Sequence, residues 1–249
     1  MPENTNKNLP YFSVIIPAHN EEGNIINTIK ETLKVFKEFN KNFEIIIVDD
    51  GSLDNTFALV KEFLETVSEK IRIETYKPNK GKGYALKYGT SFANGRLILF
   101  LDADLDLHPA MVKEMYSIMC QKSADVVIGS KMHKKSVINY PFLRRLASYA
   151  YYIIIKILFR LKIKDTQTGI KLFKKDALLE CLSKVVVERY ASDLELCVAL
   201  NKRGYKIVEA PVKVEIKRQF GRLGIKDAFK VFSDTLGVFN RLYFKKYYN

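Results

Sequence analysis

The stretch RLILFLDADLD, residues 96–106, joins an apolar run to three alternating aspartates. Its apolar part is typical of a buried β-strand, and similar runs rich in β-branched residues occupy 11–17, 43–48 and 71–76. Apolar residues recur at helical spacing between these runs, over 25–39, 55–67 and from Gly81 to about residue 93. Strands that alternate with helices predict an α/β fold with a mostly parallel sheet flanked by helices.

The composition is that of a folded, basic protein. Of 249 residues 47% are hydrophobic, and 41 Lys+Arg against 28 Asp+Glu give a formal net charge of +13, which excludes a disordered chain. The cysteines form no CxxC pair, so we expect reduced thiols in the cytoplasm at Cys120, Cys181 and Cys197. Since the N-terminus carries no apolar signal and no apolar run reaches ~18 residues, we expect a soluble or peripheral protein.

The positive charge is concentrated in two segments. Residues 131–164 contain nine Lys or Arg and no Asp or Glu, and residues 218–249 contain seven basic against two acidic residues. Residues 144–162 have the pattern of an amphipathic helix, which is either a core helix with one solvated edge or a helix lying at a membrane surface. Because 225–249 repeats the aromatic and basic composition, we favour an anionic membrane surface over nucleic acid as the partner.

Polar residues follow three of the predicted strands. They are PAHNEE at 17–22, the pair Asp49–Asp50, and DADLD at 102–106. A single acid after a strand is often only a helix cap or a turn former. Because the carboxyl ends of parallel strands lie at one edge of a sheet, we expect these three groups to converge on a single crevice.

The aspartates and a lysine indicate a metal-bound diphosphate. On an extended backbone Asp102, Asp104 and Asp106 project to one side, where their repulsion favours Mg²⁺ or Mn²⁺. The alternative is that Asp104 or Asp106 caps the following turn. Lys82, flanked by glycines, can reach a phosphate. The chain lacks the P-loop and dinucleotide fingerprints, which argues against NTPases and dehydrogenases.

An ordered set of motifs resembles the family 2 glycosyltransferases of the GT-A fold. These motifs are VIIPAHNEE (14–22), IIIVDDGSLDNT (45–56), NKGKGYALKYG (79–89) and FLDADLD (100–106). Later segments resemble polyprenyl-phosphate glycosyltransferases, above all dolichyl-phosphate β-glucosyltransferases and more distantly mannosyltransferases: GSKMH (129–133), FLRRLAS (142–148), DTQTGIKLF (165–173) and residues 190–212. The resemblance implies a Rossmann-like GT-A domain over 10–217, followed by a basic, aromatic, amphipathic segment at the membrane surface over 218–249.

The same resemblance implies roles for individual residues. It implies that the nucleotide-sugar donor is bound by Pro17, His19, Asn20, Glu21, Val48, Asp50, Lys82, Asp102 and Ala103. It implies that the metal is held mainly by Asp104, together with Asp102 and Asp106. It implies that the acceptor phosphate is held by Lys131, Arg144 and Arg145.

These roles imply a metal-dependent, inverting transfer of a hexose from a nucleotide sugar, with a UDP-sugar favoured, to dolichyl or polyprenyl phosphate at the cytoplasmic face of the membrane. Asp102 and Asp104 are the expected catalytic residues, because the metal neutralises the leaving diphosphate. A phosphate acceptor is already anionic and requires no general base, whereas a hydroxyl acceptor does. Asp193 is the candidate base, and its alternative role is a helix cap.

Two other functions remain open from the sequence. One is a soluble family 2 glycosyltransferase that acts on a sugar hydroxyl with Asp193 as the base. The other is a non-enzymatic basic module that binds RNA or lipid, which explains the net charge but not the three acidic strand ends.

Overall fold

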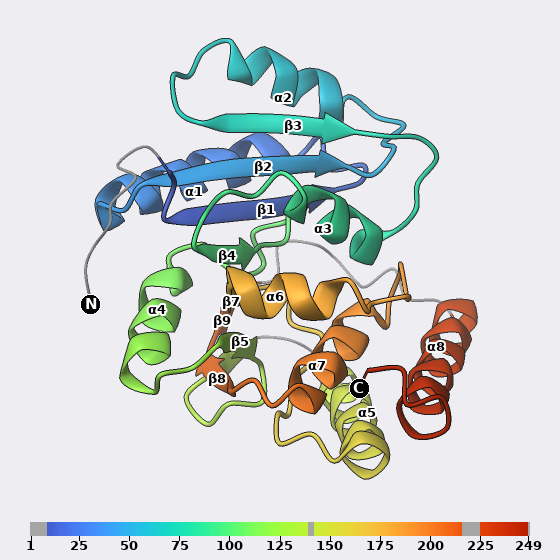
Figure 1. Cartoon of the computed structure of the whole chain (residues 1–249). Helices are drawn as coiled ribbons and strands as arrows, with labels where there is room; N and C mark the ends of the chain where they lie inside the picture. The colour runs from blue at the N-terminus through green and yellow to red at the C-terminus, as the bar shows by residue number, and fades with distance from the viewer. Residues whose placement is uncertain (1–8, 139–141, 216–224, 249) are drawn as a thin grey trace.

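The computed structural model describes residues 9–138, 142–215 and 225–248 (Figure 1). Its strands are β1 (Phe12–Ala18), β2 (Phe43–Asp49), β3 (Ile71–Thr75), β4 (Leu97–Phe100), β5 (Val126–Ser130), β6 (Val137–Ile138), β7 (Lys171–Lys174), β8 (Ile207–Pro211) and β9 (Lys213–Val214). Its helices are α1 (Ile25–Phe39), α2 (Thr56–Leu64), α3 (Lys82–Thr90), α4 (Met111–Gln121), α5 (Phe142–Phe159), α6 (Lys175–Leu182), α7 (Ser192–Lys202) and α8 (Ile225–Tyr243).

The central sheet has seven strands in the order β3-β2-β1-β4-β7-β5-β8. All neighbouring strands in it are parallel except where β7 pairs antiparallel with β4 and with β5. The prediction of a mostly parallel sheet is therefore confirmed. The four strands predicted from the sequence are β1 to β4, and each observed bound lies within one residue of the predicted one.

The period-two alternation of each strand builds one core on either face of the sheet. In β1, Val14 and Ile16 pack in the core that α1, α2 and α4 cover, whereas Ile15 packs in the core on the other face. That second core is covered by α3, α6 and α7 and continues into residues of α5 and α8. Figure 1 shows α5, α7 and α8 together in the lower part of the molecule. The result is a sheet between two helical layers.

Helix α8 is attached to α7 through Glu195, whose side chain is fully buried. One carboxylate oxygen of Glu195 accepts a hydrogen bond from Arg241 Nε of α8 at 2.8 Å. The other accepts hydrogen bonds from the backbone nitrogens of Val186 and Val187, at 2.8 and 2.7 Å. The described part of the C-terminal segment therefore packs against the main domain. The predicted boundary between residues 217 and 218 lies outside the described residues.

The predicted amphipathic helix over 144–162 is α5 over 142–159. Its Ile155 and Phe159 are buried in the core, which confirms a core-facing side. Other apolar side chains of α5 are exposed, at Leu146, Tyr149, Ile153, Ile154 and Ile157. Across the described ranges, no helix combines the length and apolarity needed to cross a membrane.

Candidate active site

A pocket of about 540 Å³ opens where β1, β2 and β4 end, at the carboxyl edge predicted from the sequence. We call it the main pocket. Most of the predicted site residues line it: Pro17, His19, Glu21, Asp50, Lys82, Asp102, Ala103, Asp104 and Asp193. The pocket is also lined by residues that are not among the predicted site residues, although all but Arg189 lie in quoted motifs: Ala18, Asn79, Gly81, Gln167, Arg189 and Tyr190.

An ion pair between Lys82 and Asp102 lies at the wall of the main pocket. Lys82 begins α3, and Asp102 follows β4. Burial lowers the pKa of Lys82, but the charges of Asp102 and Asp193 outweigh burial and raise that pKa above its usual range. Burial likewise raises the pKa of Asp102, but the Lys82 charge and hydrogen bond outweigh it and lower the pKa. Both groups are therefore charged at neutral pH.

Asp104 carries a carboxyl group with little local compensation for its charge. Burial, followed by the charges of Asp102 and Asp106, raises its pKa to about 6. Asp104 lines the main pocket and also accepts a hydrogen bond from the backbone nitrogen of Asp106 at 3.1 Å. Asp104 thus both lines the pocket and caps the following turn, which the sequence analysis treated as alternatives.

The expected alignment of the three aspartates on an extended backbone is wrong. Strand β4 ends at Phe100, and Leu105 has a φ of 58°, so the chain turns between Asp102 and Asp106. Asp106 does not line the main pocket. Within the described ranges, no three His, Cys, Asp or Glu side chains are grouped to hold a metal ion. Of the three aspartates in this stretch, Asp102 and Asp104 line the main pocket, where a cation would meet them.

His19 has a buried ring nitrogen, Nδ1, that makes no hydrogen bond. Since buried polar groups are nearly always paired, an unpaired one in a pocket wall is typical of a ligand-binding position. The neighbouring Asn20 instead joins two loops: its backbone nitrogen donates to Ser52 Oγ at 3.0 Å, and its Oδ1 accepts from the Leu53 backbone nitrogen at 2.9 Å. Asn20 does not line the main pocket.

Asp50 is buried and shapes one wall of the main pocket. Its carboxylate accepts hydrogen bonds from Asn79 Nδ2 at 2.8 Å and from the backbone nitrogens of Lys80 and Gly81 at 2.7 and 2.9 Å. It therefore fixes the loop that leads into α3. Val48 is fully buried and packs in the core beneath α3 rather than lining the pocket.

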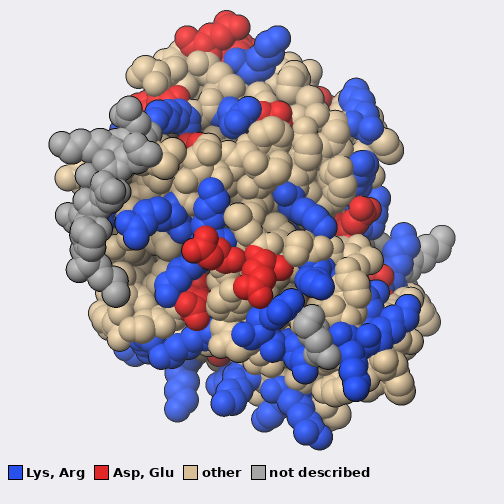
Figure 2. Space-filling view, viewed as in Figure 1, with Lys and Arg blue, Asp and Glu red and all other residues tan. Residues whose placement is uncertain are grey.

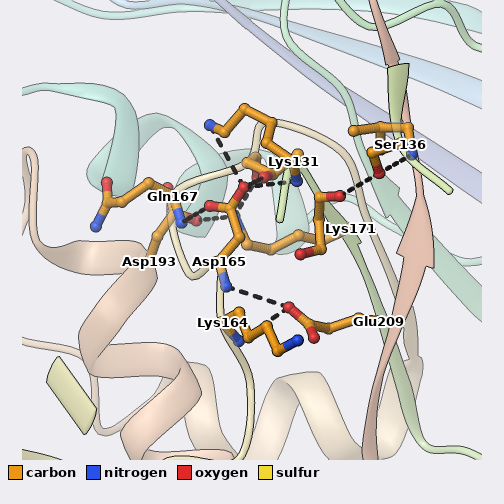
Figure 3. A network of polar contacts seen from close by, with 11 residues as sticks. Lys131, Ser136, Lys164, Asp165, Gln167, Lys171, Asp193 and Glu209 are labelled. Carbon is orange, nitrogen blue, oxygen red and sulfur yellow. Dashed lines mark hydrogen bonds and ion pairs between the residues drawn. The ribbon is translucent and has the colours of Figure 1, made fainter. Parts of the chain in front are cut away.

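Asp193 is the second residue of α7 and lines the main pocket. The helix-cap interpretation is wrong, because the cap position is Ala191 and no side-chain cap hydrogen bond is formed. Asp193 Oδ1 accepts a hydrogen bond from Lys171 Nζ at 2.7 Å, as Figure 3 shows. Lys171 is buried and also donates to the Thr168 carbonyl oxygen at 2.5 Å.

Lys131 lies beside the main pocket rather than in it. It lines a smaller pocket of about 60 Å³ with residues of α5, among them Tyr151 and Tyr152. We call this the side pocket. The backbone nitrogen of Lys131 donates to Asp165 Oδ2 at 2.9 Å, and its Nζ lies 3.6 Å from the same oxygen. The side chains of Arg144 and Arg145 lie outside the described part of the structure.

Comparison with known proteins identifies the family. The model described as "Glycosyl transferase family 2" matches residues 13–182. The chain belongs to glycosyl transferase family 2. It is 32% identical to a dolichyl-phosphate beta-glucosyltransferase of Dictyostelium discoideum, covering 81% of this chain and 65% of that protein. It is also 32% identical to the dolichyl-phosphate beta-glucosyltransferase ALG5D of Trichomonas vaginalis, covering 96% of this chain and 80% of that protein. The chain thus spans about two thirds of the Dictyostelium relative.

Solved structures agree with the GT-A fold expected for this family 2 glycosyltransferase. Glucosyl-3-phosphoglycerate synthase from Mycobacterium tuberculosis, in complex with Mn²⁺, UDP and phosphoglyceric acid, superposes with a TM-score of 0.69 at 17% identity. The match covers 92% of this chain and 78% of that one. The complex of the same synthase with Mg²⁺ and UDP gives a TM-score of 0.65 at 18% identity, covering 92% of this chain and 79% of that one. The predicted GT-A fold is confirmed.

Two features of the glycosyltransferase site depend on contacts distant in sequence. A Cβ at Gly169 would lie 1.7 Å from Asp102 Oδ2, so the absence of a side chain there is what leaves room for the Asp102 carboxylate. A Cβ at Gly81 would lie 2.6 Å from Arg189 Cγ, which shows how closely the loop before α7 packs on the start of α3. Gly169 lies in the quoted motif DTQTGIKLF and Tyr190 begins the quoted segment 190–212, whereas no quoted motif includes Arg189.

Proposed function

We propose that the protein transfers a hexose, with inversion, from a UDP-sugar to a polyprenyl phosphate such as dolichyl phosphate. The observation that carries the proposal is the main pocket, which places Lys82, Asp102 and Asp104 together at the carboxyl edge of a GT-A sheet. The relatives named dolichyl-phosphate beta-glucosyltransferases support the acceptor. Structural neighbours solved with UDP and UDP-glucose support the donor.

A divalent ion, Mg²⁺ or Mn²⁺, fits this pocket. Burial is the main cause that raises the pKa of Asp104, and repulsion from neighbouring carboxylates is the second. A cation between Asp104 and Asp102 would relieve this repulsion. Structural neighbours were solved with Mn²⁺ or Mg²⁺. When bound, such an ion would neutralise charge that develops on the leaving diphosphate.

The protein's own residues bind and orient both substrates. The Lys82 ammonium, held by Asp102, supplies a fixed positive charge for the diphosphate. The unpaired Nδ1 of His19, which also lines the pocket, is available to the nucleoside. Lys131, together with Arg144 and Arg145, would hold the acceptor phosphate. An oxygen of that phosphate would attack the anomeric carbon of the sugar from the side opposite the leaving diphosphate. The attack would invert the configuration at that carbon.

The proposal includes a peripheral position on the cytoplasmic face of an anionic membrane, where the lipid acceptor is reached. Apolar side chains are exposed along α5 and along α8, the latter at Phe229, Phe232, Leu236 and Tyr243. Figure 2 shows Lys and Arg side chains around a central acidic group and along the lower part of this face, where α5 and α7 lie. Basic residues next to an apolar helix face favour adsorption to anionic lipid.

The experiment is a transfer assay with labelled UDP-glucose, dolichyl phosphate and Mg²⁺ or Mn²⁺. We expect label in an organic-soluble product that mild acid hydrolyses. Omission of dolichyl phosphate and addition of EDTA are the controls. No lipid-linked label from any of a panel of UDP- and GDP-sugars would refute the proposal.

A second candidate, transfer to a sugar hydroxyl, is favoured by one observation. Asp193 lines the main pocket, where a general base would act on such an acceptor. Label that appears in a water-soluble glycoside, independently of dolichyl phosphate, would favour this candidate over the lipid-linked reaction.

A further inference from the structure

Gln167 is the residue that connects the two pockets. Of the residues in the described ranges, it alone lines both the main pocket, with Lys82 and Asp102, and the side pocket, with Lys131. A group transferred from a donor in the first pocket to an acceptor held near the second must pass this point. Gln167 therefore lies where the proposed function places the reacting sugar.

The side-chain nitrogen of Gln167, Nε2, is buried and has no hydrogen-bond partner of good geometry. The Tyr151 hydroxyl, which is hydrogen-bonded to Thr235 Oγ1 at 3.4 Å, also interacts with the Gln167 side chain, but outside the geometry of a full hydrogen bond to Nε2. Leaving a buried amide N–H unpaired costs stability, so its open donor suits an acceptor oxygen that a ligand or a bound water supplies. The unpaired Nε2 indicates a ligand oxygen at the junction of the pockets.

The backbone around Gln167 is fixed from both sides. Asp165 Oδ1 accepts a hydrogen bond from the Gln167 backbone nitrogen at 3.1 Å, while Asp165 Oδ2 accepts from Thr168 Oγ1 at 2.5 Å and from the Lys131 backbone nitrogen at 2.9 Å. Gly169 packs directly against Asp102. Figure 3 shows the Gln167 side chain extending away from the Asp165 carboxylate. The backbone that carries the amide is thus held in place before any substrate binds.

The chemistry of an amide favours a sugar hydroxyl over a phosphate as its partner. An amide both donates and accepts hydrogen bonds, as a hydroxyl does, whereas phosphates are matched by cations. Cations are already present on both sides of Gln167, at Lys82 in the main pocket and at Lys131 and Lys164 in the side pocket. The neutral group between them suits the uncharged part of the substrate, which is the hexose.

We propose that Gln167 recognises a hydroxyl of the transferred hexose and so determines which sugar is used. This inference rests on the proposed function and adds a specificity-determining residue to it. Sites that hydrogen-bond a substrate hydroxyl discriminate strongly against an analogue that lacks it, because the buried partner is then left unpaired. Discrimination among deoxy sugars is therefore the property that should depend on Gln167.

The test compares wild-type protein with Gln167→Leu, which keeps the approximate size of the side chain and removes the amide. The donors are UDP-glucose and its singly deoxygenated analogues. We expect the wild type to transfer sugar from one analogue about 10- to 100-fold less efficiently than from UDP-glucose. We expect Gln167→Leu to transfer sugar from that analogue and from UDP-glucose with the same low efficiency. Affinity for UDP alone, measured by calorimetry with Mg²⁺, should be unchanged.

The control is Thr166→Val, which removes the buried hydroxyl of the residue before Gln167. Thr166 lines the side pocket but not the main pocket. It should leave the ratio between UDP-glucose and each deoxy analogue at the wild-type value. A Gln167→Leu variant that keeps the wild-type ratios, that loses UDP affinity, or that changes only the KM for the lipid acceptor would overturn the role of Gln167. A wild-type protein that transfers no sugar would instead refute the proposed function.

Discussion

The Tyr248 hydroxyl donates a hydrogen bond of 2.5 Å to Oε1 of Glu195, the fully buried carboxylate of α7. Tyr248 is itself buried, and its hydroxyl also lies 3.1 Å from Arg241 Nε. Burial and the Glu195 hydrogen bond raise the pKa of Tyr248 well above its usual range. Tyr248, which lies beyond the end of α8, is therefore an internal part of the domain and a hydrogen-bond donor to the buried Glu195.

We expect Tyr248→Phe to destabilise the protein by about 1.5–3 kcal/mol, because a buried carboxylate loses one of its hydrogen-bond donors. The measurement is chemical denaturation of the purified protein at neutral pH. Tyr247→Phe is the matched control, because the neighbouring Tyr247 is 38% exposed. Equal stability of the two variants would show that the Tyr248 contact contributes little.

Asp104→Asn should reduce sugar transfer by about 100-fold or more. Loss of a group that only supports a metal ligand costs about 10- to 100-fold, so loss of a ligand should cost at least as much. The assay is transfer at saturating donor and metal, with circular dichroism to confirm that the variant is folded. Near-wild-type turnover would show that Asp104 is not a metal ligand.

The same substitution should stabilise the metal-free protein at neutral pH. Burial and the neighbouring carboxylates raise the pKa of Asp104 to about 6, so its ionisation opposes folding as pH rises from about 4 to 6. Because Asp104 is partly exposed, we expect a gain of about 1–2 kcal/mol for Asp104→Asn above pH 6 and no gain below pH 4. Thermal denaturation in EDTA across this pH range measures the difference. A gain that does not vary with pH would contradict the electrostatic cause.

Lys131→Ala should raise the KM for the lipid phosphate by about 10- to 100-fold while UDP affinity stays the same, because a charged hydrogen bond to the acceptor is lost. Asp165 keeps the hydrogen bond from the backbone nitrogen of residue 131, so the loop should remain in place. Lys135→Ala is the control, since Lys135 is exposed and lines neither pocket. A loss of UDP affinity as large as the rise in KM for the lipid phosphate would show that Lys131 binds the donor instead.

The paired substitution Phe229→Ser and Phe232→Ser should weaken binding to anionic liposomes by about 10-fold or more, because both side chains are exposed on α8. Truncation of the C-terminal segment is a poor test, since it also removes Arg241 from the buried Glu195. Cosedimentation at low and high salt is the measurement, and Leu9→Ser, at a residue that is 54% exposed, is the control. Binding that is unchanged in the paired variant would leave α8 without a membrane role.

The sequence predicted those features that depend on local patterns. β-Branched runs located β1 to β4 to within one residue, and the polar strand ends located the main pocket. It did not predict strand β7, whose place between β4 and β5 depends on pairing with residues distant along the chain. The alternation of Asp102, Asp104 and Asp106 misled because Leu105 adopts a left-handed conformation. Contacts such as that between Gly81 and Arg189 leave no local periodicity.

The close packing of Gly169 on Asp102 has a consequence for sequence variation among homologues. Because the Asp102 carboxylate occupies the space where a side chain at residue 169 would lie, the two positions are not free to vary separately. We expect homologues that keep an acid at the first position to keep glycine at the second, and larger residues to occur there only where the acid is absent. Laboratory variants at residue 169 would then resemble variants of Asp102 itself, although Gly169 does not line the main pocket.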